Sequence, residues 1–339
     1  MLTLTNLITV DRGVNVLKKR WAAAAAAAAG LVLLTACGSG GSSGGSGGAI
    51  TLGFAQVGAE SGWRTANTKS IQESAKTAGI ELKFSDAQQK QENQISAIRS
   101  YIQQKVKVIA FSPVVESGWD TVLKEAKTAN IPVILTDRAI DSPDKSLYKT
   151  FLGSDFIAEG KKAGQWLTKE FGSATGQVNI VELQGTTGSA PANDRKKGFA
   201  DVIAADPKYK IVASQTGEFT RAKGKEVMEA FLKSQPKIDV LYAHNDDMAL
   251  GAIEAIEAAG KVPGKDIKIV SVDGVKDALT ALADGKINHV VECNPLLGPQ
   301  LMDLVKKVSA GEQVPARIET QETEFDQASA KAALPQRQY

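Results

Sequence analysis

The sequence predicts an α/β fold of doubly wound, parallel-rich sheets, and three observations support this prediction. From Ala49 onward, short β-branched runs alternate with helix-length amphipathic stretches. Several of these runs are apolar throughout or nearly so, as in Val106–Phe111, where Lys107 is the one charged residue. Such runs are typical of strands buried on both faces of a parallel sheet. The 339 residues, less a 36-residue export segment, leave 303, which suits two domains of about 150 residues each.

The predicted elements alternate along the whole chain. The expected strands are Ile50–Val57, Ile80–Phe84, Val106–Phe111, Val133–Thr136, Thr150–Gly153, Val178–Leu183, Lys210–Ser214, Asp239–Ala243, Ile267–Val272 and Asn288–Glu292. The expected helices are Gly62–Ala78, Lys90–Gln104, Gly118–Ala129, Phe156–Phe171, Arg195–Ala205, Arg221–Ser234, Asp247–Ala259, Lys276–Ala283 and Gly298–Ser309. Ser61 and Ser117, in the twin tetrapeptides Glu-Ser-Gly-Trp, are expected to cap two of these helices. Gly260 and Gly285 are expected to end two others.

The first 48 residues predict export and lipid anchoring. Three basic residues, Lys18–Arg20, precede the uncharged run Trp21–Ala36, which is shorter than the ~20 residues that span a bilayer. Leu34–Cys37 resembles the lipobox of bacterial lipoproteins, in which the cysteine is acylated; the alternative is a chance cysteine after an alanine tract. We therefore expect a signal peptide at 1–36, and an acylated Cys37 with a Gly/Ser tether at 37–48. The protein would be held on the outer face of the bacterial cytoplasmic membrane.

Composition excludes several classes of function. The formal net charge is +2, and removal of the export segment leaves about −1, so nothing favours a nucleic-acid partner. Two cysteines and two histidines exclude a disulfide scaffold and make a histidine-based zinc centre improbable. We expect no metal and no cofactor. Cys293 is interpreted as a buried, small apolar residue.

Polar residues gather where the predicted strands end, which is where open α/β sheets bind ligands. They comprise Gln56, Glu60, Trp63 and Arg64 after the first strand, Asp137 and Arg138 after the fourth, Gln184, Asp194 and Arg195 after the sixth, Asn245–Asp247 after the eighth, and Asp273 after the ninth. Carboxylates and amides accept hydroxyl protons, guanidinium groups donate to hydroxyl oxygens, and an aromatic face covers a sugar ring. This set therefore suits a neutral polyol.

Each of these residues has an alternative interpretation. Asp137 and Arg138 could form a surface ion pair, Trp63 could pack in a core, and Asp273 could belong to a plain turn. His244 and Trp119 are interpreted as structural residues.

Catalysis has little support in the sequence. It contains no G-x-S-x-G elbow and no H-E-x-x-H motif. A surface glycosidase would need two carboxylates, but the arginines beside Asp137 and Asp194 are expected to lower their pKa values, which disfavours a general acid. We therefore expect a binding protein rather than an enzyme.

The chain from residue 49 to about 325 resembles the ribose/galactose-type periplasmic binding proteins of sugar ABC transporters. The segments that carry the resemblance are Gly53–Gly58, Glu60–Arg64, Gln88–Gln94, Leu135–Arg138, Val181–Gly185, Asp194–Phe199, Gly224–Glu229 and Tyr242–Met248. The resemblance implies two Rossmann-like lobes joined by a three-crossing hinge, with crossings near Gly153-Ser154, Asp273-Gly274 and Glu292–Asn294. It places 49–153 plus 275–292 in the first lobe and 154–274 plus 293–339 in the second. Cys293 departs from the family pattern at the last crossing.

The resemblance also implies a function. A monomeric receptor would hold a monosaccharide, galactofuranose in the first place, between Glu60, Trp63, Arg64, Asp137 and Arg138 of one lobe and Asp194, Arg195, Asn245 and Asp273 of the other lobe or hinge. It would close on the sugar and deliver it to permease subunits. Galactose, ribose, arabinose and inositol remain alternative ligands, and presentation to a chemoreceptor remains compatible. Sugar-responsive repressors share the fold, but an export signal and a tether occupy the place of their DNA-binding helices.

Overall fold

The protein was analysed as a computed structural model, which describes residues 49–339. The predicted signal peptide (1–36), the acylation of Cys37 and the tether (37–48) lie outside the described residues. Within 49–339, every helix is too short or too polar to cross a bilayer.

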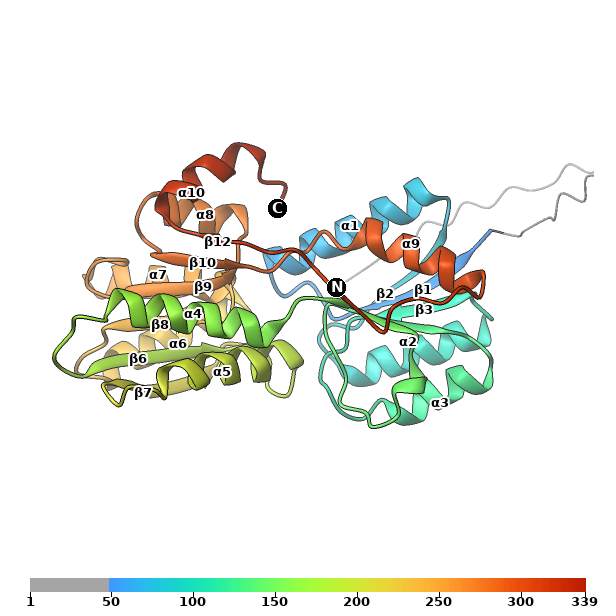
Figure 1. Ribbon diagram of the computed structural model, residues 1–339, viewed down its shortest axis with the longest axis horizontal. Coiled ribbons are helices and arrows are strands. Elements are labelled where there is room, and N and C mark those ends of the chain that lie inside the picture. Colours follow the sequence, from blue (N-terminus) through green and yellow to red (C-terminus); the bar gives the residue numbers. More distant parts are fainter. Residues whose placement is uncertain (1–48) are drawn as a thin grey trace, which may run out of the picture. The chain divides into compact units, whose positions relative to one another are not determined.

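The first lobe is built on a six-stranded parallel sheet with the order β11-β5-β4-β3-β1-β2 (Figure 1). Its strands are β1 (Thr51–Gln56), β2 (Glu81–Asp86), β3 (Val108–Phe111), β4 (Val133–Thr136), β5 (Thr150–Gly153) and β11 (Arg317–Glu319). One face is covered by α1 (Gly62–Ala78) and α9 (Gly298–Ser309), the other by α2 (Gln91–Gln103) and α3 (Asp120–Thr128). The short 3-10 helix η1 (Lys145–Leu147) precedes β5.

The second lobe has a sheet of the same size with the order β12-β10-β9-β8-β6-β7, in which only β12 runs antiparallel to its neighbour. The strands are β6 (Val178–Gln184), β7 (Tyr209–Thr216), β8 (Val240–Ala243), β9 (Lys268–Asp273), β10 (His289–Glu292) and β12 (Glu324–Phe325). Its helices are α4 (Phe156–Glu170), α5 (Ala190–Ile203), α6 (Arg221–Ser234), α7 (Asp246–Ala258), α8 (Lys276–Ala283), α10 (Gln327–Ala333) and the 3-10 helix η2 (Leu334–Gln336). Every residue of β8 and β10 is buried, as their apolar runs predict.

The predicted fold class is confirmed, but part of the predicted division into lobes is wrong. Strand β10 pairs with β9, so 275–292 belongs to the second lobe and Asp273-Gly274 is not a crossing. The chain crosses between the sheets after β5, after β10, and between β11 and β12. Helix α9 packs on α1 of the first lobe, because its apolar face (Leu301, Val305) completes the core over Leu52. The residues after β12 return to the second lobe.

Two sequence expectations about helix starts have different outcomes. The Ser61 side chain accepts a hydrogen bond from the Arg64 amide and caps α1, as predicted. Ser117 does not cap α3, which begins two residues later than expected, at Asp120. There, the Ser117 carbonyl accepts a hydrogen bond from the Gln91 side chain instead.

Two glycines let α4 and α5 pack backbone against backbone. A Cβ on Gly160 would lie 2.2 Å from the Arg195 carbonyl oxygen, and one on Gly198 would lie 2.2 Å from the Ile157 carbonyl oxygen. No side-chain atom fits between the two helices at this point of contact. This close approach fixes the position of Arg195, which lies on α5.

We expect Gly160→Ala to lower the free energy of unfolding by about 1–3 kcal/mol, because the added methyl group must push the two helices apart. Gly176→Ala is the matched control, since no atom lies within 4 Å of the Cβ that it would add. Its effect should stay within about 0.5 kcal/mol. Denaturant unfolding of both variants would measure the difference, and equal stabilities would contradict this account of the crossing.

Candidate functional site

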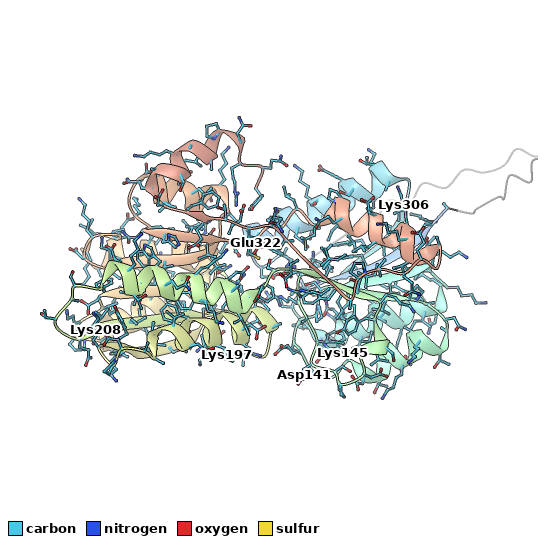
Figure 2. The ribbon with its side chains drawn as sticks, viewed as in Figure 1. Asp141, Lys145, Lys197, Lys208, Lys306 and Glu322 are labelled. Carbon is cyan, nitrogen blue, oxygen red and sulfur yellow. The ribbon has the colours of Figure 1, made fainter. Side chains whose placement is uncertain are left out.

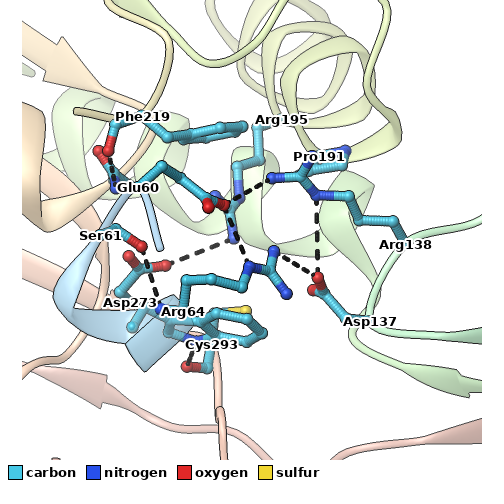
Figure 3. Close-up of a pocket in the computed structure, with 12 residues that line it drawn as sticks. Glu60, Ser61, Arg64, Asp137, Arg138, Pro191, Arg195, Phe219, Asp273 and Cys293 are labelled. Atoms are coloured by element: carbon cyan, nitrogen blue, oxygen red, sulfur yellow. Dashed lines mark hydrogen bonds and ion pairs between the residues drawn. The ribbon is translucent and has the colours of Figure 1, made fainter. Parts of the chain in front are cut away.

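A pocket of about 290 Å³ lies where the carboxyl ends of the two sheets face each other (Figure 3). It is lined by Glu60, Ser61, Trp63, Arg64, Asp137 and Arg138 from the first lobe, by Pro191, Arg195, Phe219, Asn245 and Asp273 from the second, and by Cys293 at a crossing. The structure therefore brings together every binding residue that the sequence predicts, except Asp194.

On the first lobe, two arginines are held by two carboxylates. Arg64 Nη2 lies 2.7 Å from Asp137 Oδ2, and Arg64 Nε donates to Glu60 Oε1 at 3.1 Å. Arg138 Nη2 reaches the same Glu60 oxygen at 3.4 Å. Burial by itself lowers the pKa of Arg64, but Asp137 and Glu60 more than offset this effect and raise it above its usual range. Burial and the charge of Arg64 lower the pKa of Arg138 to about 10, so both groups are cations at neutral pH.

Two buried polar atoms of this network have no hydrogen-bond partner among residues 49–339. They are Glu60 Oε2, an acceptor, and Arg138 Nε, a donor. Arg138 Nε is 3.8 Å from Asp137 Oδ2, which is too long for a hydrogen bond. Buried polar atoms are almost always satisfied, so an acceptor and a donor left free beside a pocket point to a ligand that can both donate and accept.

On the second lobe, Arg195 is the central side chain. Its Nε donates to Glu159 Oε2 at 2.7 Å, its Nη1 donates to the His244 carbonyl at 2.6 Å, and its Nη2 lies 3.7 Å from Asp273 Oδ1. Burial raises the pKa of Asp273 well above its usual value, although Arg195 acts in the opposite direction. Asp137 and Asp273 have φ angles of 61° and 129°, values that non-glycine residues rarely adopt and that concentrate at functional sites.

Asp194 does not line the pocket, and the predicted effect on its pKa is wrong. The side chain is half-buried, and burial raises its pKa, with further contributions from Glu116 and Asp155. Its neighbour Arg195 turns to Glu159 and Asp273 instead. Adjacent residues on a helix point in different directions, so proximity in sequence did not produce an ion pair here.

Aromatic side chains close two walls of the pocket. Trp63 is 5% exposed and packs with the core of the second lobe, while its Nε1 donates to the Cys293 carbonyl at 2.7 Å. Phe219 lies under Arg138, with 5.3 Å from the guanidinium carbon to the ring centre. The sequence analysis missed Phe219, although an aromatic residue in the short connection between β7 and the helix cap Thr220 would have been a usable signal.

Asn245 has a structural role that its position already suggests. Its Oδ1 accepts from the Met248 amide at 3.0 Å and caps α7, and its Nδ2 donates to the Phe219 carbonyl at 3.1 Å. It therefore holds Phe219 in place, and one amide hydrogen remains for a ligand.

The end of the chain also supports the site. Arg337 Nε donates to the Gly274 carbonyl at 2.6 Å, and its Nη1 donates to Glu292 Oε1 at 2.6 Å. The Gly274 amide donates to Asp246 Oδ2 at 2.6 Å. The turn that follows Asp273 is thus clamped from both sides, by contacts that no local pattern predicts.

Hydrogen bonds join the two lobes beside the pocket. The Gly62 amide, in the first turn of α1, donates to Asp247 Oδ2 at 2.7 Å. The Glu116 amide donates to the Gly188 carbonyl at 2.9 Å, and Asn193 Nδ2 donates to Glu116 Oε2 at 2.5 Å. The lobes are therefore in contact around the pocket.

His244 is buried, as its structural interpretation predicts. Its Nδ1 faces the Gly185 amide at 3.4 Å and its Nε2 lies 3.1 Å from Glu182 Oε1. These partners select the neutral tautomer with the proton on Nε2, because Nδ1 must accept. Burial lowers the pKa of His244, although Glu182 acts in the opposite direction.

We expect His244 to titrate below 6.5, its ordinary pKa. As the pH falls below this value, the unfolded chain takes up the proton first, so the stabilisation present above 6.5 is progressively lost. The chain has only two histidines, so the NMR resonances of wild type and His289→Gln assign His244 directly. Titration of His244 above 6.5 would contradict the structure.

Comparison with known proteins identifies the family. Residues 52–313 match the model of the periplasmic binding protein domain. The chain is 51% identical to the galactofuranose-binding protein YtfQ of Escherichia coli K12 over 79% of this chain and 85% of that protein.

Solved structures agree with this relationship. A Mycobacterium smegmatis protein in complex with β-D-fucofuranose is 69% identical, with a TM-score of 0.85 over 86% of this chain and 96% of that one. The arabinose ABC transporter binding protein of Shewanella sp. ANA-3, bound to L-arabinofuranose, is 52% identical, with a TM-score of 0.82 over 85% of this chain and 95% of that one. The chain belongs to the periplasmic binding protein family.

Proposed function

We propose that this protein captures one monosaccharide in its furanose form, galactofuranose or a close analogue, and delivers it to the permease of an ABC transporter. The observation that carries the proposal is the pair of free, buried polar atoms, Glu60 Oε2 and Arg138 Nε, on the wall of a 290 Å³ pocket. A hydroxyl group both donates and accepts, so a polyol satisfies both atoms at once.

The charges of the pocket favour a neutral ligand. Its three arginines are already opposed by Glu60, Asp137 and Glu159, while burial raises the pKa of the fourth carboxyl group, Asp273, well above its usual value and favours its neutral form. A charged ligand would leave one buried charge unopposed, whereas a sugar forms charge-assisted hydrogen bonds of about 1.5–3 kcal/mol each without changing the balance. A hexose has about 12 heavy atoms, so binding at ~1 μM requires roughly 0.7 kcal/mol per atom, which is well below the limit for small ligands.

The furanose ring form and the lipid anchor rest on different observations. Two similar structures hold furanose sugars, and YtfQ is named for galactofuranose. The lipobox-like segment ending at Cys37 and the Gly/Ser run after it support a receptor tethered to the outer face of the cytoplasmic membrane.

Calorimetry tests the ring form. Free D-galactose contains a minor furanose fraction, so it should bind with an affinity reduced by that fraction, without turnover. Methyl β-D-galactopyranoside is locked in the six-membered ring and should give no heat, while methyl β-D-galactofuranoside controls for the methyl group. Equal binding of the pyranoside and galactose would contradict furanose selectivity, and silence towards every sugar, including ribose, arabinose and inositol, would overturn the proposal.

Substitutions test the assigned residues. Arg138→Ala and Asp273→Ala should each weaken sugar binding by about 10- to 100-fold, since each removes a charge-assisted hydrogen bond. Asp194→Ala is the matched control: it removes a carboxylate beside Arg195 that does not line the pocket, and its affinity should stay within about twofold. Circular dichroism checks that each variant is folded. Wild-type affinity in the first two variants would remove these assignments.

A further inference from the structure

The three crossings between the lobes converge on one cluster of side chains. Ser154 follows β5, Cys293 follows β10, and Glu322 lies between β11 and β12, where Figure 2 labels it. Ser154 Oγ is 3.4 Å from Cys293 Sγ and also donates to Glu322 Oε1. The cluster is separate from the first-lobe carboxylates that face the sugar pocket.

Three side chains of this cluster could share one cation. Glu159, Cys293 and Glu322 each offer one ligand atom, and these atoms lie within 4.8 Å of one another. Glu159 and Cys293 are 1% and 2% exposed, and Glu322 is half-buried. The set combines two carboxylates from different elements with a thiol.

Glu159 supplies an independent sign of a missing ligand. Its Oε2 accepts from Arg195, but its Oε1 is fully buried and has no hydrogen-bond partner among residues 49–339. A buried carboxylate oxygen without a partner costs at least about 1–3 kcal/mol. A cation shared with Cys293 and Glu322 would remove this cost.

Two side chains of the cluster border a cavity that opens to solvent. A second cavity, with an empty volume of about 540 Å³, is lined by Glu159 and Glu322. Asp155 and Glu319 add negative charge to its lining, against the single cation of Lys162. A divalent cation would therefore be attracted to this cavity and would meet two of its ligands there.

The donor atoms select the class of metal. Magnesium and calcium prefer all-oxygen sites, whereas one thiolate with two carboxylates suits zinc. Tetrahedral zinc with bond lengths of about 2.0–2.3 Å spaces its ligand atoms by roughly 3.5 Å. The ligand atoms here lie within 4.8 Å of one another, so they must move together by at most about 1.3 Å, which carboxylate rotation can supply. Arg195 lies against Glu159 and opposes the cation. Burial raises the pKa of Glu159 to about 8 and the pKa of Cys293 well above its usual value, so both groups would release their protons when the ion binds. Water or Ser154 Oγ would complete the coordination.

We propose that Glu159, Cys293 and Glu322 form a zinc site at the crossings between the lobes. Bound there, the ion ties α4 of the second lobe to two of the three connections and stiffens the hinge. Cys293 also lines the sugar pocket and Glu159 holds Arg195, so the ion would lie against one wall of that pocket.

Cobalt titration of the full-length protein tests the site. We expect one Co²⁺ per chain, with a thiolate-to-metal charge-transfer absorption that Zn²⁺ abolishes by displacement. Cys293→Ser should remove this band, whereas Cys37→Ser, the other cysteine of the chain, should leave it unchanged. Loss of the band in Cys37→Ser alone, or the absence of any saturable band, would overturn the proposal.

Zinc affinity, measured by competition with a chelator, tests the carboxylates. Glu159→Gln and Glu322→Gln should each weaken zinc binding at least tenfold, while Glu319→Gln, an exposed carboxylate of the same cavity, should change it less than threefold. Thermal unfolding without metal checks that each variant is folded. Unchanged affinity in both cluster variants, or an equal loss in Glu319→Gln, would contradict the assigned ligands.

Discussion

Three buried guanidinium groups, paired with carboxylates at the meeting edge of two sheets, are the constraint on which this molecule depends. Arg64, Arg138 and Arg195 are each at most 3% exposed. An unpaired charge at such a position would cost several kcal/mol, so each arginine requires its carboxylate partner. Each arginine reaches its carboxylate only if the strands before the two residues end side by side at the same edge of the sheet. The fold and the pocket therefore constrain each other.

The two sides of the pocket are organised differently. On the first lobe, Glu60 and Asp137 bridge two arginines that follow different strands. On the second lobe, a single arginine spans Glu159, Asp273 and a backbone carbonyl. A ligand between them meets fixed donors and acceptors, and little reorganisation is needed once the lobes are in contact. The opposing charges are nearly balanced before any ligand enters, which is the condition for holding an uncharged sugar firmly.

Closure and recognition are linked through the first turn of α1. The Gly62 amide in this turn donates a hydrogen bond to Asp247 of the second lobe, while Trp63 packs with the core of that lobe. Arg64, the next residue, belongs to the charge network. Any movement of the lobes must therefore displace residues that line the pocket. A ligand that binds better when these contacts are made will favour the closed state, as a two-state receptor requires.

The sequence alone determined the alternation of strands and helices, and therefore the fold class and the strand ends at which ligands bind. All ten predicted strands are present, because the hydrophobic periodicity and the apolar runs that predict them are local properties of the sequence. Strand-end position also placed Glu60, Arg64, Asp137, Arg138 and Asp273 in one pocket, since parallel strands end at one edge of a sheet.

Only the tertiary structure decided how residues 275–339, about the last fifth of the chain, are shared between the lobes. Strands β11 and β12 have three and two residues, too few to show a period, and the pairing of β10 with β9 is a non-local choice. The direction of Asp194, the place of Phe219 and the meeting of Glu159, Cys293 and Glu322 depend on the same non-local packing. A local sequence pattern shows which face of a segment is buried. It does not show which distant segment packs against that face.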